Sequence, residues 1–311
     1  MRRAGALIAV LALAGCGGGG AGTQAAHGGR TQVVAGPLQV FNGPVKAADP
    51  GDRPLALALT GASDRVRVTF KHPPRGGLLF DLDTGEVLWR HQPDRVLPIA
   101  SLTKMMTALI IAERHQLSER VLITPRVLHY AGSGVGLLPP GKQVSLKALL
   151  YGLMLVSGND AAIALAQHDA HTISGFVRRM NIRARELGLT CSRFSTPSGI
   201  RDQGNHSCVL DLATLARLDL ANPIVAKVVG TERLRMRFPI KGHFLDLFNI
   251  NPFLGDPGVT GVKTGLTNAA GRCYVITAKI GGRYLGVVLL NSPDPLKQVP
   301  QLLQAGARAK R

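Results

Sequence analysis

The sequence has few charged and few aromatic residues for its length. Of its 311 residues, 18% are charged and 5% are aromatic. Low charge together with 45% hydrophobic residues excludes a disordered chain and a coiled coil, and 37 glycines with 19 prolines fall short of a collagen-like composition. Few aromatic side chains leave little stacking surface for single-stranded nucleic acid, so no nucleic-acid partner is expected. What remains is a globular protein of one or two domains.

Acidic residues are scarce relative to basic ones. The chain has 37 Lys and Arg against 19 Asp and Glu, a formal net charge of +18. Such a surface attracts anionic partners, among them lipid head groups and acidic cell-wall polymers. Charge alone does not select one of these partners.

The amino-terminal apolar run is too short to span a membrane. It extends from Ala4 to Ala14 behind two arginines and holds about eleven residues, whereas a spanning helix needs ~20. The pattern predicts an export signal over residues 1–15. Cys16 follows Leu13-Ala14-Gly15 and resembles the lipid-modified first residue of bacterial lipoproteins, with an ordinary signal peptide as the alternative. We expect a Cys16 lipid to anchor the protein to the outer face of the bacterial cell membrane, and residues 16–74 to form a Gly/Pro/Ala-rich linker and lead-in.

Cysteine is also scarce, with four in the chain and no Cys-x-x-Cys pair. A structural zinc site is therefore not expected, and no metal or other cofactor is predicted. Export permits disulfides, and Cys191 and Cys208 flank a turn-rich stretch that a disulfide between them would close. Cys273 lies in a strand pattern and is expected as a buried apolar side chain.

Hydrophobic periodicity predicts strands at both ends of residues 75–311 and helices between them. Apolar alternation predicts a hairpin over Leu78–Arg90 and three strands, at 259–264, 272–280 and 283–290. Helical spacing predicts helices at 101–112, 146–155, 161–168, 174–187, 210–220 and from about Leu296. This order predicts an α+β fold in which an antiparallel sheet built from both chain ends is flanked by helices, with an all-helical lobe inserted.

A Ser-x-x-Lys sequence lies at the start of the helix predicted at 101–112. A hydroxyl is a poor nucleophile until a base takes its proton. The spacing places Lys104 about one turn from Ser101 on the same helix face, where burial and nearby cations can lower the amine pKa enough for it to act as that base. Alone the spacing is common by chance, and an N-cap serine beside a solvated lysine is the alternative interpretation.

Two further motifs follow in the chain. Ser157-Gly158-Asn159 lies between two predicted helices, and Lys263-Thr264-Gly265 ends a predicted strand. Ser-x-x-Lys, Ser-x-Asn and Lys-Thr-Gly in this order match the signature set of penicillin-binding proteins and serine β-lactamases. Most of residues 75–306 resembles the low-molecular-mass, serine-type D-alanyl-D-alanine carboxypeptidases, most clearly in Leu97–Ser101 and Leu153–Ala162. The implied fold is that of the β-lactamases and D,D-transpeptidases.

The resemblance implies a role for each motif residue. Ser101 would attack the penultimate D-alanine carbonyl of a peptidoglycan stem peptide, with Lys104 as general base and Ser157 relaying a proton to the leaving amine. Terminal D-alanine would be released through an acyl-enzyme, and β-lactam antibiotics would acylate the same serine as covalent inhibitors.

The same resemblance implies that the remaining motif residues bind substrate. Asn159 would hold the substrate backbone, Lys263 would supply positive charge near Ser157, and Thr264 would bind the substrate carboxylate. Gly265 belongs to the same motif, and the backbone N–H groups of Ser101 and Leu266 would form the oxyanion hole.

Some family features differ in this sequence. Many members carry a further β domain and a carboxyl-terminal amphipathic membrane helix. The Cys16 lipid is expected to supply the anchor that this helix otherwise gives. Members also tend to place an arginine after the last strand to hold the terminal carboxylate, whereas residues 291–299 offer only Lys297.

Three other functions stay open beside the carboxypeptidase. A D,D-endopeptidase would use the same residues, and a catalytically silent wall-binding lipoprotein would have no need of them. A class A-like β-lactamase would need a Glu-x-x-Leu-Asn segment, and the sequence has none. The absence of Gly-x-Ser-x-Gly argues against an α/β-hydrolase.

Several other polar residues are expected to be structural. His168 and His171 can share a helix face, but without a Glu-containing zinc motif they are expected as solvated surface residues. His206 is expected to make a structural hydrogen bond, with substrate contact as the alternative. Asp81 and Asp83 are expected to be turn residues.

Overall fold

The computed structural model describes residues 57, 64–201 and 203–309. Its main sheet has five strands in the order β2-β1-β11-β10-β9. They span Gly76–Asp81 (β1), Val87–His91 (β2), Val259–Thr267 (β9), Gly271–Ile280 (β10) and Arg283–Leu290 (β11). Each neighbouring pair is antiparallel, and β1 pairs with β11 along its whole length. The predicted sheet from both ends of the domain is thus confirmed.

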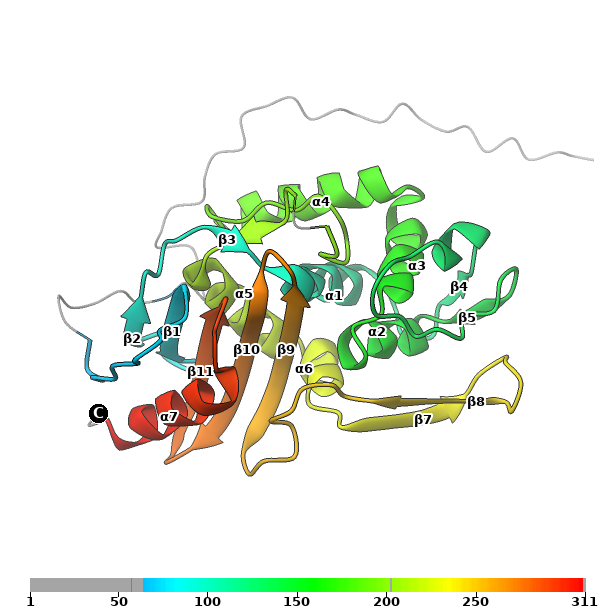
Figure 1. The fold of residues 1–311 in the computed structure, drawn as a ribbon. Helices are drawn as coiled ribbons and strands as arrows, with labels where there is room; N and C mark the ends of the chain where they lie inside the picture. The colour runs from blue at the N-terminus through cyan, green and yellow to red at the C-terminus, as the bar shows by residue number, and fades with distance from the viewer. Residues whose placement is uncertain (1–56, 58–63, 202, 310–311) are drawn as a thin grey trace, which may run out of the picture. The chain divides into compact units, whose positions relative to one another are not determined.

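Both faces of this sheet are buried. Successive strand residues point to opposite faces, so Leu78 and Val288 pack with the central helices, whereas Leu79 and Val287 pack toward the last helix. That helix, α7 (Pro295–Arg308), covers one face, and α5 (Val209–Ala221) covers the other (Figure 1).

A helical lobe is inserted between β2 and β9. It holds α1 (Thr103–Arg114), α2 (Leu146–Leu155), α3 (Asn159–Ala170) and α4 (Ile173–Glu186), followed by α5 and α6 (Pro223–Val229). In α1, nine consecutive residues from Thr103 to Ile111 are buried, as expected for a helix that passes through the core. Within the described residues no helix is long and apolar enough to cross a membrane.

Short elements complete the lobe. Two-stranded pairs join β3 (Leu97–Pro98) to β6 (His206–Ser207) and β4 (Arg120–Leu122) to β5 (Gln143–Ser145), and single 3₁₀ turns form at Ala100–Leu102 and Pro125–Leu128. The pair β7 (Arg233–Arg237) and β8 (Phe244–Phe248) forms a hairpin that the sequence analysis did not predict, as it did not predict α6. In β8, the buried residues Leu245 and Leu247 alternate with exposed ones. The strand pattern of one apolar core residue in every two was therefore present in the sequence.

The lead-in differs from its prediction. Residues 64–74 were expected to be part of a linker, but Val66 is buried beside α7 and its N–H donates to the Leu88 carbonyl oxygen at 2.9 Å. The Trp89 indole N–H donates to the Val68 carbonyl oxygen at 3.1 Å. These residues are therefore packed parts of the domain. The predicted signal at 1–15, Cys16 and most of the predicted linker lie outside the described residues.

The cysteines lie in two places. Cys191 and Cys208 are joined by a disulfide with their Cα atoms 5.5 Å apart, which closes the loop that leads into α5. Cys273 on β10 is fully buried.

Three of the residues assigned to structural roles need comment. The Asp81 carboxylate accepts from the N–H groups of Asp83 and Thr84, which confirms a turn role for Asp81. His206 pairs through its backbone with Pro98 and Arg193. His168 is not a solvated surface residue: its ring nitrogen Nε2 lies 2.8 Å from the Glu119 carboxylate and its side chain is 22% exposed, because the chain after α1 folds against the end of α3.

Candidate active site

Ser101 and Lys104 lie where a 3₁₀ turn passes into α1. The sequence analysis placed Ser101 at the start of an α-helix, but it lies inside the 3₁₀ turn Ala100–Leu102, and no side chain caps α1. Lys104 lies in the first turn of α1, and its amine is 3.0 Å from the Ser101 hydroxyl oxygen.

Lys104 is completely buried and has two further contacts. Its Nζ donates to the Asn159 amide oxygen and to the Ser198 carbonyl oxygen, both at 2.7 Å. A neutral amine has two N–H groups and one lone pair. When the two carbonyl-type oxygens take the two N–H groups, the lone pair is left facing the Ser101 hydroxyl, which is the orientation a general base needs.

The surroundings also favour the neutral amine. Burial is the largest effect lowering the pKa of Lys104 well below its usual value, and the positive charge of Lys263 lowers that pKa further. The Asp160 carboxylate opposes both effects. Lysine and serine are thus arranged as an activated nucleophile and its base.

Ser157 lies just before α3, two residues ahead of Asn159. It has a left-handed backbone conformation with φ of 58°, which is uncommon for a residue with a side chain. Its hydroxyl is buried and forms no hydrogen bond with any described residue. A strained backbone and an unpaired buried hydroxyl together indicate a functional group held ready for a substrate atom.

Asn159 begins α3, and both ends of its amide are bound by protein groups. Its oxygen accepts from Lys104, and its Nδ2 donates to the Ala131 carbonyl oxygen at 2.6 Å. The sequence analysis gave Asn159 a role in holding substrate, whereas its contacts here orient the lysine.

The edge strand β9 brings the third motif to the serine. Lys263 is buried, its Nζ donates to the Thr264 carbonyl oxygen at 2.9 Å, and burial lowers its pKa to about 7. A Cβ atom on Gly265 would lie 2.9 Å from the Ser101 backbone nitrogen. Only glycine therefore allows β9 to approach the 3₁₀ turn this closely. The approach brings the backbone of Leu266, the next residue, toward that of Ser101, as an oxyanion hole requires.

Two groups that act on Lys104, one by a hydrogen bond and one by its charge, were not identified from the sequence. The first is the Ser198 carbonyl, in the turn-rich Ser195–Ile200 segment, whose Thr196 side chain bonds the Gly199 N–H at 2.9 Å. The second is Asp160, which is buried and accepts from the N–H groups of Val135 and Gly136. The turn residues were a signal for the loop, but a backbone carbonyl carries no sequence signature of its role.

The guanidinium expected after the last strand is absent from residues 291–299, and Lys297 there is exposed and paired with Asp294 at 3.2 Å. Arg272 on β10 pairs in register with Leu266 and is therefore a diagonal neighbour of Thr264 on the same sheet face. It is exposed, and one of its N–H groups donates to the Pro293 carbonyl oxygen at 2.9 Å.

The fold and these contacts place a buried lysine amine beside a serine hydroxyl, the arrangement that a serine enzyme with a lysine base requires. Comparison with known proteins identifies the family. The family model for D-alanyl-D-alanine carboxypeptidase, peptidase family S11, matches residues 71–294, and the chain belongs to this family. The resemblance drawn from the three motifs is thereby confirmed.

Individual relatives agree with this assignment. The chain is 32% identical over 237 residues to the D-alanyl-D-alanine carboxypeptidase DacF of Bacillus subtilis, a match that covers 74% of this chain and 60% of that protein. It is 34% identical over 224 residues to DacB2 of Mycobacterium tuberculosis, covering 70% and 75%. A D-alanyl-D-alanine endopeptidase of Pseudomonas aeruginosa is 29% identical over 255 residues, covering 76% and 81%.

Solved structures share the fold. The Streptomyces K15 DD-transpeptidase superposes with a TM-score of 0.72 at 28% identity, covering 77% of this chain and 99% of that one. The predicted β-lactamase and D,D-transpeptidase-like fold is thus confirmed.

Proposed function

We propose that this protein is a serine-type D-alanyl-D-alanine carboxypeptidase that removes the terminal D-alanine from peptidoglycan stem peptides. The observation that carries the proposal is the position of the Lys104 amine between the Ser101 hydroxyl and two oxygen acceptors. Family membership supports the substrate class.

Acylation would use the groups in turn. Lys104 takes the proton of Ser101 as Oγ attacks the penultimate D-alanine carbonyl, and the Ser101 and Leu266 N–H groups stabilise the oxyanion. The peptide bond then breaks, and the proton reaches the leaving D-alanine amine through Ser157. Water hydrolyses the resulting ester, which restores the Ser101 hydroxyl and releases the shortened peptide.

Recognition of the terminal carboxylate would fall to Thr264, Lys263 and Arg272. A guanidinium binds a carboxylate through parallel N–H groups, and Arg272 is placed as a diagonal neighbour of Thr264. This assignment would replace the arginine that residues 291–299 lack. We propose further that a Cys16 lipid holds the enzyme at the outer face of the bacterial membrane, which is supported by the short apolar run and the cysteine that follows it.

The decisive experiment follows the intact mass of the purified full-length protein mixed with benzylpenicillin, beside Ser101→Ala. A penicilloyl adduct that lasts minutes and is absent from the variant supports the proposal. An adduct lost within seconds as penicillin is consumed favours a β-lactamase, and no adduct favours a silent wall-binding protein. Release of D-alanine from a pentapeptide, against cleavage of a cross-linked dimer, then separates carboxypeptidase from endopeptidase.

The anchor has its own test. Wild-type protein is expected in the membrane fraction of the producing bacterium and Cys16→Ala in the soluble fraction. An unchanged distribution of the variant would refute the lipid anchor and leave the proposed reaction untouched.

A further inference from the structure

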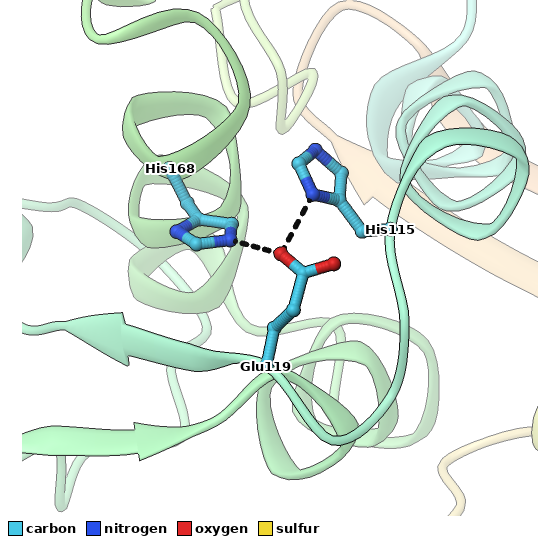
Figure 2. Close-up of side chains that lie close together, drawn as sticks. All are labelled: His115, Glu119 and His168. Atoms are coloured by element: carbon cyan, nitrogen blue, oxygen red, sulfur yellow. Dashed lines mark hydrogen bonds and ion pairs between the residues drawn. The ribbon is translucent and has the colours of Figure 1, made fainter.

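Two histidines and a glutamate gather near the carboxyl-terminal ends of α1 and α3 (Figure 2). His115 is the first residue after α1, Glu119 lies between it and β4, and His168 lies in the last turn of α3. The Glu119 oxygen Oε2 lies 2.9 Å from His115 Nδ1 and 2.8 Å from His168 Nε2. One carboxylate oxygen thus faces two imidazole nitrogens.

Asp169 fixes the orientation of the His115 ring. Its side chain is fully covered, and its two oxygens lie 2.7 Å from Nε of Arg114 and 2.7 Å from Nε of Arg179, so it is an ionised acceptor. His115 Nε2 lies 3.0 Å from the same carboxylate and donates its proton there. The other ring nitrogen, Nδ1, is the one turned toward Glu119.

When the His115 ring is neutral, its contact with Glu119 has no proton to form a hydrogen bond. A neutral imidazole has one N–H, and that N–H is given to Asp169. The Nδ1 lone pair then faces the Oε2 lone pairs of Glu119 at 2.9 Å, which is repulsive unless a positive species lies between them.

The other oxygen of Glu119 is bound by the backbone. The Gln116 N–H donates to this oxygen, Oε1, at 2.6 Å. Oε2 remains directed at the two histidines. The cluster therefore presents two nitrogen donors and one anionic oxygen to a common point.

We propose that His115, Glu119 and His168 form a binding site for a divalent transition metal of the zinc type. Two imidazoles and one carboxylate are a set that zinc accepts, with a fourth position left for water. The three ligand atoms all lie within 4.8 Å of one another. The two nitrogen–oxygen distances of 2.9 and 2.8 Å need to open by about half an ångström to reach tetrahedral spacing around zinc. The side chains of His115, Glu119 and His168 are 15%, 34% and 22% exposed, so an ion can reach the site from solvent.

Asp169 supports this assignment because metal-bound histidines usually donate their other ring N–H to a carboxylate. That contact fixes the ring and increases the basicity of the coordinating nitrogen. The Asp169–His115 hydrogen bond supplies this partner, and Arg114 and Arg179 hold the carboxylate in place.

The position of the site indicates a structural role. Lys104 lies in the first turn of α1 and Asn159 begins α3, whereas His115 and His168 lie at the opposite ends of those helices. Lys104 and His115 are roughly 16 Å apart along the axis at 1.5 Å per residue, too far for the metal to touch a substrate at Ser101. A bound ion would join the far ends of the two helices whose near ends hold the base and its amide partner.

Isothermal titration of the chelator-treated full-length protein with zinc chloride tests the proposal. We expect one saturable site per chain, loss of at least about a hundredfold in affinity for His168→Gln and Glu119→Gln, and no change for His171→Asn. His171 follows α3, is exposed, and has a left-handed backbone that asparagine tolerates, so it is the matched control.

Two further readouts keep the result decisive. Cobalt(II) in place of zinc should give the visible absorption of a tetrahedral site in the wild type and in His171→Asn only, and circular dichroism should show that each variant is folded. Absence of saturable binding to the wild type, or equal binding by His168→Gln, overturns the proposal and leaves the cluster as an ion-pair network with a doubly protonated His115. Penicillin acylation is measured separately and is expected in every one of these variants.

Discussion

The two ends of α1 and α3 differ in what surrounds their polar side chains. At the starts of these helices Lys104 and Asn159 are at most 2% exposed and contact each other. At their far ends His115 and His168 keep 15% and 22% of their side-chain surface exposed beside two carboxylates. The same pair of helices thus carries a desolvated amine at one end and a hydrated, charge-balanced cluster at the other.

The difference shows how burial decides chemistry. Removing water from Lys104 destabilises its charged form and lowers its pKa well below the usual value, which favours the neutral amine that a general base needs. At the far end, the hydrogen bond from the Gln116 N–H and the contact with His168 lower the pKa of Glu119. Reactivity is therefore expected to depend on the near end, and stability and ion binding on the far end.

The largest expected effect is at the nucleophile. Ser101→Ala should abolish penicillin acylation, because among the described residues the Ser101 hydroxyl is the one that is hydrogen-bonded to the Lys104 amine. Mass spectrometry of the intact protein measures the adduct. Ser174→Ala, at an exposed position of α4, is the control and should acylate normally; a residual adduct on Ser101→Ala would mean that another residue is acylated.

Removal of the base should have the next largest effect. Lys104→Met preserves much of the side-chain volume but has no proton acceptor, so the acylation rate should fall by ~10²–10⁴-fold. Stopped-flow acylation with a chromogenic β-lactam measures that rate. Lys142→Met, at an exposed position, should leave it unchanged, and a loss below tenfold for Lys104→Met would assign the base to another group.

At the far end the expected loss is in stability. Asp169→Asn removes a covered charge that pairs with Arg114, Arg179 and His115, and should lower the free energy of unfolding by about 1–3 kcal/mol. Chemical denaturation measures this change. The acylation rate of the folded variant should stay within a few-fold of wild type, and a loss as large as that of Lys104→Met would remove the distinction between the two ends.

A substitution of Arg272 tests whether the substrate-binding site around Ser101 and Lys104 includes this residue of β10. Arg272→Gln should raise the KM for a D-Ala-D-Ala peptide by about tenfold, the effect of one lost charge-assisted hydrogen bond. The kcat should change little, because Arg272 contacts neither Ser101 nor Lys104 in the proposed reaction. Steady-state release of D-alanine separates the two constants, and an unchanged KM would exclude Arg272 from carboxylate binding.

The smallest expected change is a shift in pH dependence. Acylation needs neutral Lys104, so its rate should rise as pH increases through the Lys104 pKa. The charge of Lys263 lowers that pKa, and Lys263→Met should therefore move the acid limb to higher pH. Acylation rates between pH 4 and 9, at saturating β-lactam, test the sign of the shift; movement to lower pH would contradict the proposed coupling.

The agreement between sequence and structure follows the range of the interactions. The strands β9, β10 and β11 and the helices α2 and α4 were predicted nearly to their ends, because alternation and helical spacing are local properties of the chain. The start of α1 was predicted wrongly, because the same residues can form a 3₁₀ turn or an α-helical turn. Here the 3₁₀ turn lies against β9, a contact that the local sequence does not encode. The hairpin β7–β8 was not predicted, although its residues alternate as strand residues do. On its exposed face, Arg233 lies over the ring of Phe248 and Arg235 over that of Phe244, contacts that form only once the two strands pair.

The sequence by itself determined the three motifs and the alternation that builds the sheet, because each is written within a few neighbouring residues. Only the tertiary structure decided that Lys104 is buried, that Ser198 and Asn159 orient it, and that His115, Glu119 and His168 meet. The contacts of Lys104 with Asn159 and Ser198, and that of Glu119 with His168, join residues 49 to 94 positions apart. Desolvation and convergence of distant side chains arise from packing, which no local pattern encodes.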